Sequence, residues 1–133
     1  MDRIHHVAIF TTDCAATVAF YREVFGAEAS DTPTQPSVVR VGGAILHVFE
    51  HGSGGASWSP THLHHIALQA SDLDEFVAVR SRLLARGACH EEVIDFGVGA
   101  HVSVLATDPD GGMLEVLVAV EDREALPFPV VAH

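Results

Sequence analysis

Short stretches of β-forming residues alternate along the chain with two segments of helical periodicity. In the first half, the β-rich stretches predict four strands, at 4–10, 27–32, 37–41 and 44–50. The segment after the first strand predicts a helix from about Asp13 to Val24 or Phe25, which Gly26 ends. Its expected inward stripe is Ala16, Ala19, Phe20 and Val24. The first half therefore predicts the order β-α-β-β-β.

The second half repeats this order. A helix is predicted over 73–86, with an inward stripe of Phe76, Val79, Leu83 and Leu84. The predicted strands are 63–70, 89–95, 100–107 and 113–120. Residues 51–63 are rich in Gly, Ser and Pro and predict a linker, and the tail 121–133 is charged and then interrupted by proline.

Two pairs of segments match each other directly. His5-His6-Val7-Ala8-Ile9 corresponds to His64-His65-Ile66-Ala67-Leu68 at an offset of 59, and an aspartate, Asp13 or Asp72, follows each at the same spacing. The segment 43–49 corresponds to 111–117 at an offset of 68. Such internal similarity predicts a duplicated unit. We expect module one at 4–50, the linker at 51–63, module two at 64–120 and the tail at 121–133.

The duplication puts metal-ligand types at equivalent positions: His6 with His65, and His47 with Glu115. Side chains alternate along a strand, so if Leu114, Val116 and Val118 face the helix, Glu115 lies on the open face, as His47 does by the repeat. Related by a pseudo-two-fold axis, the four side chains would converge. Three imidazoles and one carboxylate suit a divalent transition metal such as Zn, Ni, Co, Mn or Fe.

The repeat alone leaves the register of the histidines open. Each module begins with two adjacent histidines, so His5 and His64 compete with His6 and His65. Glu50 is a rival carboxylate, but it lies three residues from His47 and therefore on the opposite face of the strand.

Composition narrows the classes of partner. The chain has a net charge of −11, seven arginines and no lysine, which argues against nucleic-acid binding and excludes lysine Schiff-base chemistry. It lacks an apolar run of roughly 18 residues, as a membrane span requires. With only two cysteines and no signal-peptide pattern at the N-terminus, we expect a cytoplasmic protein.

Several motifs together resemble the vicinal oxygen chelate superfamily, which includes glyoxalase I, fosfomycin-resistance proteins, extradiol dioxygenases and bleomycin-binding proteins. They are the two His-X-Ala starts with aspartate seven residues after His6 and His65, the segment 20–26 (Phe-Tyr-Arg-Glu-Val-Phe-Gly), and 108–115 (Asp-Pro-Asp-Gly-Gly-Met-Leu-Glu). The resemblance spans 4–120. It implies an α+β fold in which two tandem βαβββ modules form a curved mixed sheet around a metal-binding cavity, in one domain of 1–133.

The resemblance also implies the ligand set. The family's histidine ligand precedes the aspartate by seven residues, which selects His6 and His65 and gives His6, His47, His65 and Glu115 as metal ligands. Glyoxalase I carries a glutamate at the second of these positions, so His47 is a departure. We expect a metal-dependent, glyoxalase-like lyase or isomerase that acts on a small molecule with adjacent oxygens, with Glu115 as ligand and candidate base.

Two alternatives stay open. An Fe(II) extradiol-type dioxygenase uses two histidines and one glutamate in the same fold. A metal-free, acidic drug-binding protein similar to the bleomycin-resistance proteins fits the charge but has no need of four ligand-type residues. We expect a homodimer, and the cavity in this fold forms either within one chain or across a swapped dimer.

Overall fold

The computed structural model describes residue 1 and residues 5–30, 36–50, 65–97 and 99–133. The predicted linker 51–63 and His64 lie outside the described residues. The chain divides into two compact units, 1–62 and 63–133, which we describe separately as unit one and unit two.

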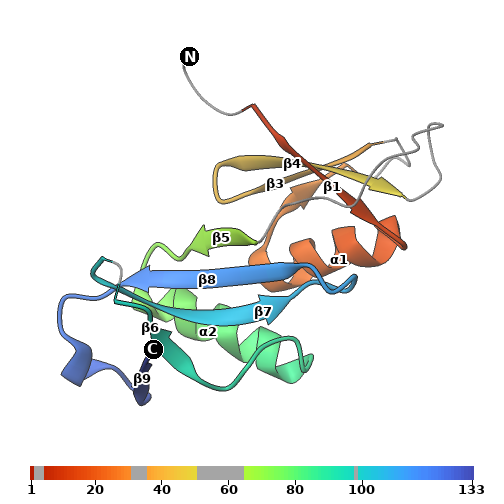
Figure 1. Ribbon diagram of the computed structural model, residues 1–133. Coiled ribbons are helices and arrows are strands. Elements are labelled where there is room, and N and C mark those ends of the chain that lie inside the picture. The colour runs from red at the N-terminus through yellow and green to blue at the C-terminus, as the bar shows by residue number, and fades with distance from the viewer. Residues whose placement is uncertain (2–4, 31–35, 51–64, 98) are drawn as a thin grey trace. The chain divides into compact units, whose positions relative to one another are not determined.

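Unit one contains a four-stranded mixed sheet and one helix (Figure 1). Its elements are β1 (Val7–Thr11), α1 (Cys14–Phe25), β2 (Glu28–Ala29), β3 (Ser37–Val41) and β4 (Ala44–Glu50). The strand order is β1-β4-β3-β2, with β1 parallel to β4 and the other pairs antiparallel. Helix α1 packs on β3 and β4, so the opposite face of this sheet is the open one.

Unit two repeats this arrangement and extends it by one strand. Its elements are β5 (Ile66–Gln69), α2 (Leu73–Ala85), β6 (Val93–Asp95), β7 (His101–Thr107), β8 (Met113–Ala119), a 3-10 turn (η2, Arg123–Ala125) and β9 (Val130–Ala132). The order is β5-β8-β7-β6-β9, with β5 parallel to β8 and β9 parallel to β6. Helix α2 packs along β8. The predicted α+β fold, two βαβββ modules with mixed sheets, is confirmed.

Strand register shows the duplication directly. In unit one Ala8 of β1 pairs with His47 of β4, and in unit two Ala67 of β5 pairs with Glu115 of β8. These pairs are related by the offsets of 59 and 68 found in the sequence. His47 and Glu115 therefore occupy the same place in the two sheets.

Alternating burial separates the two faces of each sheet as expected. Leu46 and Val48 on β4, and Leu114 and Val116 on β8, are at most 2% exposed and face the helices. Val118 continues this buried row. The intervening ligand-type residues of β4 and β8 are half-buried and lie on the open face.

The helix stripes agree with prediction in part: Ala19 and Leu84 are half-buried rather than buried, and Ala16 departs from the prediction. Phe76, Val79 and Leu83 are buried in α2. In α1 the buried residues are Cys14, Thr17, Phe20, Tyr21 and Val24. Ala16 is exposed, so its predicted inward position is wrong: the stripe runs one residue further round the helix, through Thr17.

The repeated aspartates cap the two helices. The Asp13 carboxylate accepts a hydrogen bond from the Ala16 amide at 3.0 Å, and the Asp72 carboxylate accepts one from the Glu75 amide at 2.8 Å. Gly26 follows α1 with φ of 66°, a left-handed backbone conformation that residues other than glycine rarely adopt.

The strands 37–41 and 44–50 are confirmed residue for residue, while others are shorter than predicted. β1 runs from Val7 to Thr11, so His5 and His6 precede it, and residue 4, where the strand was predicted to begin, lies outside the described residues. β6 begins at Val93 rather than 89, and Cys89 makes only an isolated bridge to Ala106. These ends lack a continuous partner strand, which alternation in the sequence does not reveal.

The tail packs on unit two. β9 adds a parallel strand to β6, and the Phe128 ring lies 5.8 Å from the Phe76 ring on α2. Arg80 places its guanidinium 5.5 Å from the centre of the same Phe128 ring. The apolar tail residues thus have an identified docking surface on α2 and the sheet edge.

Candidate metal centre

Unit one brings two of the predicted ligands into contact. The His6 and His47 rings stack with centres 3.8 Å apart and planes 10° from parallel. His47 is carried by β4, and His6 precedes β1, the parallel neighbour of β4. Because Ala8 pairs with His47 and His6 lies two residues before it, both imidazoles belong to the open face.

His5 contacts this pair from the side. Its Nδ1 lies 2.9 Å from Nδ1 of His6, so one of the two nitrogens donates a hydrogen bond to the other. That contact occupies Nδ1 of His6 and makes Nε2 the available ligand atom of that ring. A partner on the second ring nitrogen is the usual means of orienting a metal-binding histidine.

His47 is held toward its neutral form. Partial burial lowers the pKa of its imidazole, and positive charge on His6 and then on His5 lowers the pKa further. A neutral imidazole is the form that binds a metal ion, so the surroundings of His47 favour ligation over protonation.

Unit two brings the other two predicted ligands together. Nε2 of His65 lies 3.2 Å from Oε2 of Glu115, with the His65 side chain 36% and the Glu115 side chain 14% exposed. His65 precedes β5 by one residue, and Glu115 sits in the middle of β8. The two elements are parallel neighbours, like those that carry the pair in unit one.

Ser103 is a residue of this site that the sequence reasoning missed. Its hydroxyl donates a 2.6 Å hydrogen bond to Oε1 of Glu115, and the residue is fully buried. Ser103 lies on β7, the antiparallel neighbour of β8. This bond fixes the carboxylate and leaves Oε2 directed at His65. A small polar residue inside an otherwise apolar strand, Val102-Ser103-Val104, was the available signal.

The spacing of the donor atoms suits a transition metal. Ligand atoms about 2.1 Å from an ion lie about 3.0 Å apart at right angles and about 3.4 Å apart in a tetrahedron. The 3.2 Å between His65 Nε2 and Glu115 Oε2 falls between these values. Nitrogen and carboxylate oxygen are also the ligand types that Zn, Ni, Co, Mn and Fe accept.

Each unit thus supplies one pair of ligand-type residues. Within the described residues, no group of three or more His, Cys, Asp or Glu side chains gathers around one point. The rival Glu50 lies elsewhere: its carboxylate accepts a 3.3 Å hydrogen bond from the Cys14 amide at the start of α1, on the helix side of the sheet. That all four predicted ligands share one ion stays a prediction.

The comparisons with known proteins identify the family. The sequence model of the Glyoxalase/Bleomycin resistance protein/Dioxygenase superfamily matches residues 3–116. The chain belongs to this superfamily. The match covers both units, including all four ligand-type residues, and confirms the resemblance that the motifs indicated.

Solved structures of similar fold carry different activities in their names. Lactoylglutathione lyase from Agrobacterium tumefaciens is 24% identical, with 89% of this chain and 94% of that chain covered and a TM-score of 0.67. A genomically encoded fosfomycin resistance protein from Listeria monocytogenes is 21% identical, with 91% and 96% covered and a TM-score of 0.69. Oxidase ChaP-H1 is 25% identical, with 90% and 98% covered and a TM-score of 0.69.

Two further observations complete the comparison. The search of curated proteins gives no match. Across the residues that the structure describes, no helix is both long and apolar enough to cross a membrane.

Proposed function

We propose that His6, His47, His65 and Glu115 together bind one divalent transition metal, and that the protein is a metal-dependent lyase or isomerase of the glyoxalase type. Its substrate is a small molecule with two adjacent oxygens. Members of this superfamily generally use divalent metals, and one neighbour in fold is a lyase.

One observation carries the proposal. His47 and Glu115 stand at the same register position of the two sheets, and each lies beside a histidine that precedes the parallel neighbouring strand. A duplicated fold has no structural need to keep a ligand-type pair at this position in both copies. Shared metal binding gives a reason for both pairs.

The bound metal would act as a Lewis acid on the substrate oxygens. The chain's own groups fix the ligands. Ser103 holds Oε1 of Glu115, so the carboxylate presents Oε2 in a set direction. His5 holds Nδ1 of His6 in the same way in unit one. The hydrogen bond from Ser103 supports Glu115 as a ligand. Glu115 would act as a base only after its Oε2 is released from the metal.

Elemental analysis tests the ligand set. The full chain is purified metal-free and incubated with Zn²⁺, Ni²⁺, Co²⁺, Mn²⁺ or, anaerobically, Fe²⁺, and excess ion is removed by gel filtration. We expect one ion per chain for the wild type and loss of stoichiometric binding in His65→Ala and Glu115→Ala. Circular dichroism checks that both variants remain folded.

A matched histidine controls for adventitious binding. His133 is exposed and follows β9, at the opposite edge of the unit-two sheet from β5, so His133→Ala should keep the full metal content. A full metal equivalent in His65→Ala or in Glu115→Ala would overturn the ligand assignment. Absence of metal from the wild type would favour a metal-free binding protein, for which the charge of −11 suits a cationic ligand.

An oxygen-dependent reaction is the second candidate, supported by the 25% identity to an oxidase of similar fold. Two histidines and one carboxylate are the ligand pattern of non-haem Fe(II) oxygenases. Oxygen uptake by the Fe²⁺-loaded protein in the presence of catechols separates the two reactions. Oxygen uptake by the wild type that is lost in Glu115→Ala would favour the dioxygenase. No oxygen uptake by the wild type would favour the lyase or isomerase.

A further inference from the structure

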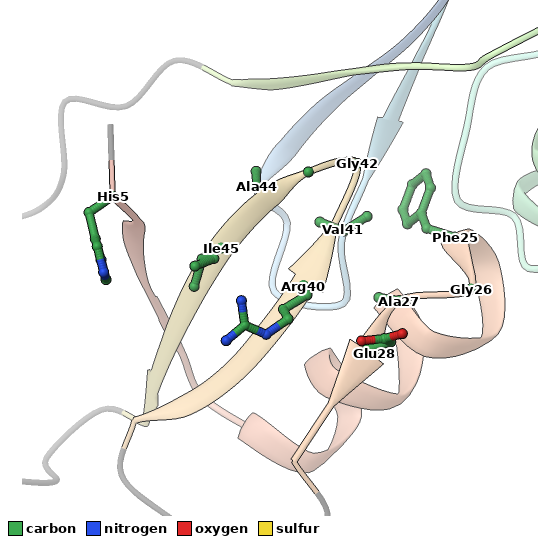
Figure 2. Close-up of a pocket in the computed structure, with 11 residues that line it drawn as sticks. His5, Phe25, Gly26, Ala27, Glu28, Arg40, Val41, Gly42, Ala44 and Ile45 are labelled. Carbon is green, nitrogen blue, oxygen red and sulfur yellow. The ribbon is translucent and has the colours of Figure 1, made fainter. Parts of the chain in front are cut away.

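A hollow in unit one takes Arg40 and Ile45 from the open face of the sheet into its lining. Its volume is about 450 Å³, and it lies between the end of α1 and the β3–β4 hairpin (Figure 2). Phe25 and Gly26 line it from the helix, Gly42 and Ile45 from the hairpin, and His5 from the chain before β1. Arg40 supplies its positive charge.

Arg40 is unusual among the arginines of this protein. It is the one arginine carried by a strand in the described parts of the chain, and within them it makes no ion pair. Glu28 faces it across the β2–β3 pairing, but Figure 2 shows the guanidinium directed away from the Glu28 carboxylate, toward the Ile45 side of the hollow. The Arg40 guanidinium is therefore available to a ligand.

Unit two has a hollow at the equivalent place, with different chemistry. Its volume is about 280 Å³, and its lining includes Gly87 after α2, Thr107 and Met113. Thr107 pairs with Met113 as Arg40 pairs with Ile45, and Ile45 and Met113 are related by the repeat offset of 68. No lysine or arginine lines the hollow of unit two. The guanidinium is thus a property of unit one and not of the duplicated architecture.

The hollow lies within reach of a small molecule bound at the ligand pair. Ile45 and His47 are two residues apart on one face of β4, which corresponds to about 7 Å. Arg40 sits opposite Ile45 on the neighbouring strand. A substrate that contacts His47 therefore needs only a few further atoms to reach the guanidinium.

We infer that the hollow of unit one is a carboxylate-binding subsite, in which Arg40 forms a charge-assisted, two-pronged pair with an anionic group of the substrate. An arginine fork matches a carboxylate in this way. A single negative charge fits better than a phosphate dianion, because the Glu28 carboxylate also lines the hollow. The inference rests on the proposed function, since it describes the same substrate.

The test uses the metal-free, ¹⁵N-labelled full chain and two matched probes, pentanoate and its neutral amide, pentanamide. We expect pentanoate to shift the Arg40 Nε–H signal and the Gly42 amide, and pentanamide to bind at least about tenfold more weakly, since a hydrogen bond to a charged group contributes about 1.5–3 kcal/mol. The Gly87 and Thr107 amides of unit two should not distinguish the two probes.

Three variants sharpen the result. Arg40→Gln should weaken pentanoate binding about tenfold or more, and Arg40→Lys should retain part of it as a point charge. Arg82→Gln removes one exposed positive charge on α2 and should bind like the wild type. Undetectable pentanoate binding, equal affinity for both probes, or unchanged binding by Arg40→Gln would overturn the inference.

Metal content separates this inference from the proposed function. Arg40→Gln should keep one ion per chain, because Arg40 is not among the proposed ligands. If pentanoate binds through Arg40 but the wild type takes up none of the five metal ions, the subsite is upheld and the metal proposal is overturned. If the wild type binds one metal ion per chain but binds pentanoate no better than pentanamide, the metal proposal is upheld and the subsite is overturned.

Discussion

Unit one and unit two share a backbone plan and differ in the chemistry placed on it. Each has a βαβββ order, a parallel pair of strands and a ligand-type pair on the open face of its sheet. Unit one offers two stacked imidazoles, whereas unit two offers an imidazole and a carboxylate fixed by a buried serine. The ligand-type residues therefore keep equivalent positions in the two units but differ in charge.

The hollows of the two units also differ in the charge of the residues that line them. The hollow of unit one carries a guanidinium, and that of unit two carries Cys89, Leu105 and Met113 at its wall. Burial raises the pKa of the Cys89 thiol, with a smaller opposing effect from the charge of Arg80, so this group stays a neutral thiol. The hollow of unit one therefore offers a positive charge that the hollow of unit two does not offer.

The largest effect is expected in the two equivalent cores. Leu46 and Leu114 are related by the repeat and are each 1% exposed. Replacing either by alanine should lower the free energy of unfolding by about 2–5 kcal/mol, through lost burial and the cavity left behind. Urea denaturation measures the change. Met113→Ala, at a site 40% exposed, is the control, and a loss under 1 kcal/mol in only one leucine variant would show that the cores are not equivalent.

Ser103 should matter for the metal and not for the fold. Ser103→Ala removes the hydrogen bond that fixes Glu115, and loss of such a support weakens metal affinity by about 10–100-fold. Competition with a chromophoric chelator gives the affinity. Ser37, on β3 of unit one, interacts with Cys14 on the helix side, so Ser37→Ala should leave the affinity unchanged. Equal affinities in both variants would remove Ser103 from the site.

The helix caps should respond alike in the two units. Asp13→Ala and Asp72→Ala each remove one hydrogen bond to an amide of the first turn, and each should destabilise the protein by about 1 kcal/mol. Asparagine at either position keeps an acceptor and should restore most of the loss. Thermal denaturation checks both pairs, and a cap that tolerates alanine would mark an end fixed by other contacts.

The smallest effect concerns protons in unit one. In the metal-free protein the pKa of His47 should lie below its ordinary value of 6.5, because of burial first and of His6 and His5 next. Below pH 6.5 His47 is protonated in the unfolded chain but stays largely neutral in the folded chain. The contribution of His47 to the free energy of unfolding therefore falls as the pH drops from about 7 through the folded pKa. NMR titration of the His47 imidazole measures its pKa in the folded protein.

Replacement of a neighbour isolates one cause of this shift. His6→Gln removes the largest electrostatic contribution and should move the pKa of His47 partway back toward 6.5, since burial still acts. An unchanged pKa in His6→Gln would mean that the stacked rings do not interact electrostatically.

Most of the fold could be read from local patterns. Two β-rich runs separated by Gly42-Gly43 gave the bounds of β3 and β4, and the repeat offsets predicted which strand positions correspond before any pairing was known. Capping aspartates and the glycine after α1 marked the helix ends because their effects are local. The open-face position of Glu115 followed from alternation with the apolar residues facing the helix, and that of His47 followed from the repeat.

The features that were missed depend on pairing between distant segments. Ser103 reaches Glu115 only because β7 lies beside β8 in one particular register. Its place between two valines marks Ser103 as unusual, but the sequence does not show which residue it bonds. The same holds for β9, whose partner strand lies far back in the chain. The availability of Arg40 likewise depends on the direction its side chain takes from β3.

The strand at the end of the described tail has a consequence for biosynthesis. Unit one contains all its elements before the first residue of unit two leaves the ribosome, whereas the sheet of unit two lacks an edge strand until β9 is made. Domains generally fold from the N-terminal side as synthesis proceeds. The His6–His47 pair of unit one can therefore be assembled first, while β6 keeps an unprotected edge until Val130–Ala132 have left the ribosome.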